Sequence, residues 1–280
     1  MITYLTEPFA LPFMVRALVA ASLASAACAV VGTYVVLRGM AFLGDALAHS
    51  ILPGVAIGYL LGRGDRSTVL WWALATAAGA ALAMGAMARR ARLKEDTAIG
   101  IVLAAMFALG IALISTVRGY AVDLNHFLFG NVLAVSPQDL WLMAGLAAGV
   151  IFTVVLLYRE LLITSFDPVL AATLRLPARA LHNLLLILVA ATVVLSLQAV
   201  GVALTLALLV TPPTTGYLLA HRLPTMMALG VVSGLLSAIL GIYLSYYAGI
   251  ATGPSIVLVA TGLFLTALVL SPKRRTLLSR

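Results

Sequence analysis

Charge is the scarcest feature of this sequence of 280 residues, because only 9% of them are Asp, Glu, Lys or Arg. Soluble globular domains have about 25% charged residues, so this chain has too little polar surface to fold in water. Cysteine is also scarce, and the single Cys28 excludes an internal disulfide and a multi-thiolate metal site. Hydrophobic residues make up 63% of the chain, and the mean hydropathy is +1.15. We therefore predict an integral membrane protein.

A phosphate-binding loop of the form Gly-x-x-x-x-Gly-Lys-Ser/Thr is absent as well. Such a loop cradles the phosphates of ATP in P-loop ATPases. The chain is therefore not expected to be an enzyme, and any ATP hydrolysis that drives it is expected in a separate chain.

Nine apolar segments are present, and each is close to the roughly 20 residues that a helix needs to cross a bilayer. None alternates like a strand, and helices satisfy their own backbone hydrogen bonds in lipid. The segments are Phe13–Leu37, Gly44–Gly62, Thr68–Ala88, Thr97–Val117, Leu140–Tyr158, Arg179–Gln198, Val202–Ala220, Thr225–Ala248 and Pro254–Leu270. We predict an all-α bundle of eight to nine transmembrane helices that forms one domain over residues 1–280. Pro212 and Pro213 interrupt the seventh segment, so a broken or re-entrant helix is an alternative there.

The positive charges predict the orientation. If the N-terminus lies outside and all nine segments cross the membrane, thirteen of the 17 basic residues are cytoplasmic. They are Arg38, Arg89, Arg90, Arg92, Lys94, Arg159, Arg175, Arg179, Arg222, Lys273, Arg274, Arg275 and Arg280. Cytoplasmic loops carry an excess of Lys and Arg, so we predict an outer N-terminus and a cytoplasmic C-terminus. The net charge of +8 then reflects topology and does not indicate nucleic-acid binding.

Ionisable residues are nearly absent from the interiors of these segments. Arg16 and His182 lie near segment ends, where long side chains can reach the interface. The second segment is the exception, because Asp45 and His49 are four residues apart in it. On a helix this spacing puts both on one face with Cβ atoms about 5–6 Å apart, so they could share a divalent ion. The alternative is a capping aspartate and a satisfied core histidine, although ionisable groups inside a membrane mark functional sites by default.

Pro53 follows this pair on the same helix. Proline has no N–H, so the carbonyl of His49 loses its helical donor. That oxygen could accept a water or face the ion, or a neighbour could satisfy it at a plain kink. We predict that Pro53 and Gly54 shape the pathway beside the pair.

Two side chains are too few for a divalent cation, which takes four or more ligands. A symmetric dimer with this helix on its axis would supply two carboxylates and two imidazoles. Such a nitrogen and oxygen set suits zinc, manganese or ferrous iron.

Two loops are longer than ordinary turns. The inner loop, Arg159–Pro177, contains a short amphipathic stretch over residues 165–177. Asp167 is placed to cap a helix with Pro168 at its first position, and Pro177 is expected to stop it. This stretch is either a docking element for a cytoplasmic partner or an ordinary loop.

The outer loop, Arg118–Gln138, contains His126 and an apolar patch, Phe127–Phe129. We interpret His126 as an ordinary loop histidine. It nevertheless lies on the side of the membrane where a delivering protein would dock.

The stretch from Arg38 to Gly54, RGMAFLGDALAHSILPG, resembles the signature of the permease subunits of ABC importers for manganese, zinc and iron. The similarity continues in Phe127–Ser136, Phe166–Pro177 and Gln198–Leu204, and it covers nearly the whole chain. Two departures are Arg175, where the family usually has glycine, and Pro212-Pro213 in place of a single proline. The family is usually described with about eight spans, so the ninth predicted segment could be a partial helix.

The resemblance implies a homodimer in the bacterial inner membrane, with a cytoplasmic ATP-binding subunit on each chain and an extracytoplasmic metal-binding lipoprotein. It implies that Asp45 and His49 contact the permeating ion. It also implies that the stretch within 165–177 is the coupling helix that docks into the ATPase. The coupling residues are then Phe166, Asp167, Pro168, Val169, Leu170, Thr173, Arg175 and Leu176.

The sequence therefore predicts a permease that moves manganese, zinc or iron into the cytoplasm and holds no permanently bound cofactor. An ion-coupled secondary transporter is one alternative, but such proteins typically need several buried carboxylates in broken helices, and only Asp45 is available. A membrane scaffold gives no reason to keep an Asp–His pair in lipid. A permease-like chain repurposed for a non-metal solute also stays open.

Overall fold

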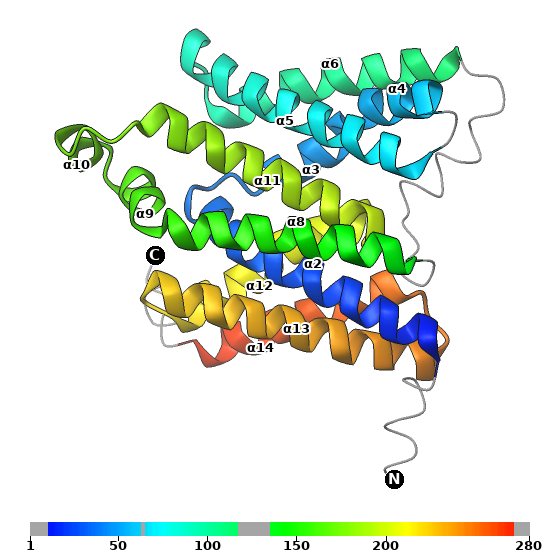
Figure 1. The fold of residues 1–280 in the computed structure, drawn as a ribbon. Coiled ribbons are helices and arrows are strands. Elements are labelled where there is room, and N and C mark those ends of the chain that lie inside the picture. Colours follow the sequence, from blue (N-terminus) through cyan, green and yellow to red (C-terminus); the bar gives the residue numbers. More distant parts are fainter. Residues whose placement is uncertain (1–10, 63–64, 117–134, 272–280) are drawn as a thin grey trace. The chain divides into compact units, whose positions relative to one another are not determined.

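The computed structural model describes residues 11–62, 65–116 and 135–271, and within these ranges the chain is all helix and connecting turns (Figure 1). The helices are α2 Pro12–Leu37, α3 Phe42–Ser50, α4 Leu52–Gly62, α5 Arg66–Ala91, α6 Glu95–Ser115, α8 Pro137–Leu156, α9 Tyr158–Phe166, α10 Pro168–Thr173, α11 Ala178–Val200, α12 Val202–Leu219, α13 Leu223–Ala248 and α14 Thr252–Leu270. Within the described ranges, 8 helical spans are long and apolar enough to cross a bilayer, and α12 is a shorter apolar helix. The predicted all-α bundle of eight to nine spans is confirmed.

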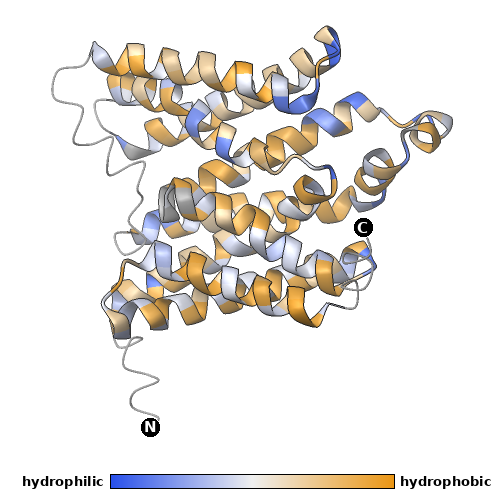
Figure 2. Cartoon of the chain, turned by 180° about the vertical axis from the view of Figure 1, so that it is seen from behind, coloured by the Kyte–Doolittle hydropathy of each residue, from blue (hydrophilic) through white to orange (hydrophobic). Residues whose placement is uncertain are grey.

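Hydrophobic residues make up most of each long helix, and most hydrophilic residues lie near helix ends (Figure 2). On α8, for example, Trp141 is 81% exposed and Phe152 is also exposed. Large apolar side chains rarely gather on a surface that faces water. This surface is suited to lipid, as expected for a multi-pass membrane protein.

The chain divides into two compact units. In the first unit, α12, α13 and α14 pack on one another. In the second unit, α3, α4, α5 and α6 pack together, and α9 packs on α10. The single domain over residues 1–280 stays a prediction.

The seventh predicted segment is one continuous helix, α12, with Pro212 and Pro213 inside it. The alternative of a broken helix is therefore wrong for this segment, and the re-entrant alternative stays open. Both prolines are buried, and a Cβ on Gly32 of α2 would collide with the carbonyl of Leu209 and with the ring of Pro213. Close packing against neighbouring helices lets a membrane helix tolerate proline, so the packing here holds α12 together.

Candidate metal site

The second predicted segment forms one candidate span, Phe42–Gly62, with an interruption of one residue. It consists of α3 and α4, which meet at Ile51. Pro53 is the second residue of α4, a position where its missing N–H has no helical partner to lose. The N–H of Ile51 donates to the carbonyl of His49. Of the two alternatives for that oxygen, the structure therefore favours a neighbour that satisfies it.

Asp45 and His49 both lie on α3, just before this break, and their side chains face one another. The Nε2 atom of His49 is 3.7 Å from Oδ1 of Asp45, and the two side chains are 35% and 27% exposed, respectively. Metal–ligand distances for these atoms are about 2.0–2.2 Å. One ion could therefore contact both atoms without any movement of the helix.

The imidazole of His49 is held by an aromatic neighbour. The ring of Phe107 on α6 meets it edge to face, with the ring centroids 5.8 Å apart and an interplanar angle of 89°. The Nδ1 atom of His49 is buried and has no hydrogen-bond partner among the described residues. Packing, and not a hydrogen bond to Nδ1, therefore orients this ring.

A single chain supplies only part of a metal site. Among the residues that the structure describes, no three His, Cys, Asp or Glu side chains come together to hold an ion. The pair on α3 thus provides two donors, as the sequence predicts, and further donors have to come from water, backbone or a second chain.

Pro53 and Gly54 are both buried. A Cβ on Gly54 would collide with Thr76 and with the backbone of Trp72 on α5. The glycine therefore allows α4 and α5 to pack closely just beyond the break. A pathway-shaping role for Pro53 and Gly54 stays a prediction.

The inner loop folds into α9 and the short helix α10, which the structure places as predicted. Oδ1 of Asp167 accepts the N–H of Leu170 at 2.8 Å, so Asp167 caps α10 and Pro168 begins it. The apolar side chains of this segment are exposed, and Val169 is exposed by 75%. Exposed apolar groups of this kind mark a contact either with another protein or with the membrane surface.

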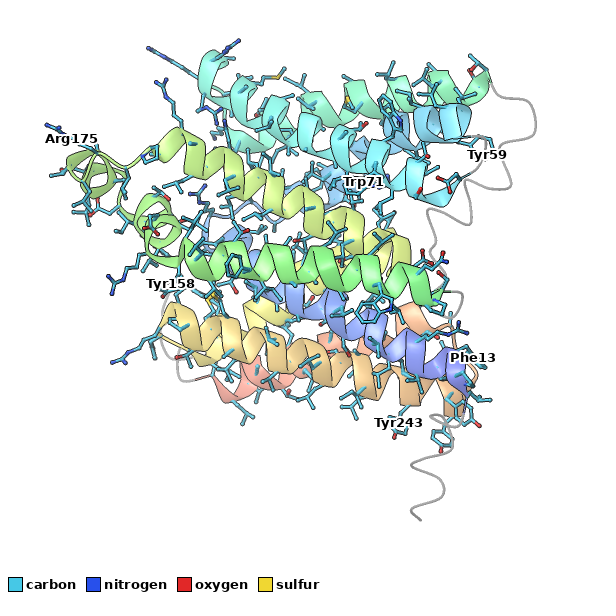
Figure 3. The ribbon with its side chains drawn as sticks, viewed as in Figure 1. Phe13, Tyr59, Trp71, Tyr158, Arg175 and Tyr243 are labelled. Atoms are coloured by element: carbon cyan, nitrogen blue, oxygen red, sulfur yellow. The ribbon has the colours of Figure 1, made fainter. Side chains whose placement is uncertain are left out.

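The end of α10 differs from the prediction that Pro177 stops it. The helix ends at Thr173, because the N–H of Leu176 donates to Ala171 at 2.9 Å and that of Arg175 to Ala172 at 3.0 Å. These two bonds form a Schellman cap, in which the residue after the cap is left-handed. Arg175 takes this conformation, with φ of 52°, and its side chain points away from α10 (Figure 3). Glycine is the residue that favours such a position.

One contact could not be found from the sequence. Nη1 of Arg38 lies 2.6 Å from Nδ1 of His182, and Nε of Arg38 donates to Oγ of Ser165 at 3.2 Å. The interpretation of His182 as a residue that reaches the interface is thus incomplete. The three residues are far apart in the sequence, and no local pattern pairs them. The predicted role of His126 lies outside the described residues, as does most of the outer loop.

A carboxylate and an imidazole side by side in a membrane span mark a functional site, since ionisable groups are costly in lipid. Residues 10–271 match the family described as the ABC 3 transport family. The chain belongs to this family.

Similar proteins cover nearly the full length of the chain. "Manganese transport system membrane protein MntC" of Halalkalibacterium halodurans is 46% identical over 265 residues, which cover 95% of this chain and 89% of that protein. "Chelated iron transport system membrane protein YfeD" of Yersinia pestis is 36% identical and covers 95% of this chain and 88% of its own length. The solved structure "PsaBC from Streptococcus pneumoniae in complex with Fab" has 36% identity and a TM-score of 0.85, and covers 98% of both chains.

Proposed function

We propose that this chain is the membrane permease subunit of an ATP-binding-cassette importer that moves divalent metal ions into the cytoplasm of a bacterium. The observation that carries the proposal is the Asp45–His49 pair, which lies inside a broken span with its two donor atoms 3.7 Å apart. A permease of the ABC 3 transport family with this pair can pass a small cation from ligand to ligand. The protein is a multi-pass protein of the inner membrane.

Manganese is the first metal to test, and iron the second. Relatives at 46% and 36% identity are named for manganese and for chelated iron, respectively. Carboxylate and imidazole are ligands that both metals accept, and zinc accepts them too. The ion is cargo, and we infer no permanently bound cofactor.

Two chains would complete the site. A homodimer with α3 on its two-fold axis would bring together two carboxylates and two imidazoles without any further residue. This number of donors meets the minimum for a divalent ion. The two-donor geometry in one chain supports this pairing.

A cytoplasmic ATP-binding subunit would dock on α10. Its exposed apolar residues Val169, Leu170 and Leu174 suit a groove on a partner, and the chain has no phosphate-binding loop of its own. An extracytoplasmic metal-binding lipoprotein would deliver the ion from the other side. Membership of the ABC 3 transport family argues against the secondary transporter and the scaffold.

Metal uptake by cells that express single variants tests this function. We expect Asp45→Asn and His49→Gln to lower manganese uptake more than ~10-fold, since each removes a direct ligand and even indirect changes cost about that much. Membrane insertion should stay normal, as measured by the amount of protein in isolated membranes.

Asp65 provides the matched control, because Asp65→Asn removes the same charge from outside the membrane. Its side chain accepts bonds from Ser67 and from the N–H of Thr68, which lower the pKa of Asp65 to about 2. Asp65→Asn should leave uptake unchanged. Normal uptake by both Asp45→Asn and His49→Gln would contradict the proposed function.

A further inference from the structure

Arg38 joins the segment that carries α10 to the start of the helix that carries the metal pair. It is the first residue after α2, and its guanidinium has two partners on two different helices. Nε donates to Oγ of Ser165 on α9 at 3.2 Å, and Nη1 is 2.6 Å from Nδ1 of His182 on α11. One side chain therefore holds α9 and α11 together.

The chemistry of these contacts fixes the direction of each bond. A guanidinium can only donate, so Nδ1 of His182 accepts, and the neutral imidazole carries its proton on Nε2. The hydroxyl of Ser165 accepts from Arg38 and donates to the carbonyl of Leu161 at 2.6 Å. The chain of bonds thus runs from the backbone of α9 through Arg38 to α11. The contacts are partly buried, where hydrogen bonds to charged groups are stronger than in water.

Arg38 lies between the segment of α9 and α10 and the turn before α3. On one side, Ser165 lies two residues before Asp167, which caps α10. On the other side, α3 begins at Phe42, and only the turn that includes Gly39, with φ of 70°, separates it from Arg38. A movement of α9 and α10 must therefore either break the bond to Arg38 or pull on the turn before α3.

We propose that Arg38 is a positioning residue that couples movement of α10 to the Asp45–His49 helix. The inference rests on the proposed function, because it takes α10 as the docking site of the ATPase. With the bonds intact, α3 follows α9. With the bonds broken, the ATPase moves α10 without moving the metal pair. Arg38 does not touch the ion, and its effect is transmitted through α3.

A second arginine offers a matched control within the same unit. Nη2 of Arg89 donates to Oδ1 of Asn183 at 3.0 Å, so it joins α5 to the residue next to His182 on α11. This bond has the same donor type and the same helix as acceptor. It involves neither α9 nor the turn before α3, so its loss should not uncouple transport.

The experiment uses the full complex of permease, ATP-binding subunit and metal-binding protein in lipid vesicles, with manganese as the probe. Two rates are measured, ATP hydrolysis and manganese uptake, and their ratio is the number of ATP molecules used per ion. For Arg38→Gln we expect that ratio to rise at least about tenfold, since losing even one hydrogen bond to a charged group has about that effect. Hydrolysis itself should change less than about twofold, which corresponds to an ordinary surface substitution. Arg89→Gln should leave the ratio unchanged.

Variants of the two acceptors test the same bonds while Arg38 stays in place. His182→Asn keeps an oxygen near the position of Nδ1 and should stay coupled, whereas His182→Leu removes the acceptor and should raise the ratio. Ser165→Ala should also raise it. If the Arg38→Gln permease does not assemble with its partners, these variants still test whether the bonds of Arg38 couple ATP hydrolysis to uptake.

Two results would overturn the proposal. The first is an unchanged ratio in Arg38→Gln, or in His182→Leu and Ser165→Ala together. The second is an equal change of the ratio in Arg38→Gln and Arg89→Gln, which would mean a general loss of packing around α11. Failure of the proposed function would look different, because the unaltered complex would then neither take up manganese nor bind the ATPase.

Discussion

Helices α3 and α10 both place side chains in unusual surroundings, but in opposite ways. On α3, Asp45 and His49 place ionisable groups within a segment that is long and apolar enough to cross the membrane. On α10, Val169 and Leu170 expose apolar groups on a loop outside it. Both arrangements are unfavourable for an isolated chain. In the function proposed here, an ion and a second chain compensate for this on α3, and another protein does so on α10.

The largest effect expected on the α10 side comes from Val169→Asp. A charge at the most exposed apolar position should prevent docking and lower both association with the ATPase and manganese uptake by more than ~10-fold, as for a central interface residue. Co-purification of the ATPase with the permease measures association. The control is Leu93→Asp, which places the same charge on an exposed leucine in the turn between α5 and α6. Normal association of Val169→Asp would show that the apolar face of α10 has another role.

The second prediction concerns Pro53 and the interruption between α3 and α4. Pro53→Ala restores an N–H one turn after His49 and should join α3 and α4 into one helix. The direction of the Asp45–His49 pair should then change, and manganese uptake should fall about tenfold, as for other changes that reorient a metal ligand. Thermal stability of the purified permease should be equal or higher.

Pro213→Ala in α12 is the control for this prediction, because α12 is already continuous through its two prolines. It should lower uptake less than Pro53→Ala does. Equal effects of the two substitutions on uptake would mean that the break at Ile51 has no special part in transport.

A smaller effect is expected at the cap of α10. Asp167→Ala removes the bond to the N–H of Leu170 and should destabilise α10 by about 1 kcal/mol, the usual value for a helix N-cap. Asp167→Asn keeps an acceptor and should have little effect. Hydrogen exchange of the α10 amides measures this difference, and equal exchange in the two variants would mean that the cap does not hold the helix.

The smallest effect concerns the left-handed caps. Arg175 after α10 and Arg92 after α5 both have φ of 52°. Replacing either with glycine relieves an unfavourable conformation worth roughly 1 kcal/mol, so both Arg175→Gly and Arg92→Gly should raise thermal stability slightly. Only Arg175→Gly should change association with the ATPase, because only Arg175 lies on the coupling segment. A loss of stability in both variants would contradict the account of these caps.

Most of the helices could be predicted from the sequence, because long apolar segments with charged ends have few other solutions in a bilayer. The fourth segment was predicted over Thr97–Val117, for example, and the helix is α6, Glu95–Ser115. The cap at Asp167 and the shared face of Asp45 and His49 also follow from local spacing.

The remaining features depend on packing between distant parts of the chain. The sequence suggested a break at Pro212-Pro213, whereas α12 is continuous there, and it suggested a kink near Pro53, where the structure has a local interruption at Ile51. Proline removes a donor in both places, and the neighbouring helices decide the outcome. The bond between Arg38 and His182 spans 144 residues of sequence, so no local pattern could have indicated it.

The central claim is that Asp45 and His49 form half of a metal site that two chains complete. Its most direct test is the stoichiometry of manganese bound to the purified permease, measured together with its oligomeric state in detergent or lipid discs. The account predicts a dimer that binds about one ion per two chains, and no bound ion after Asp45→Asn or His49→Gln. One ion per monomer, or binding that survives both substitutions, would contradict it.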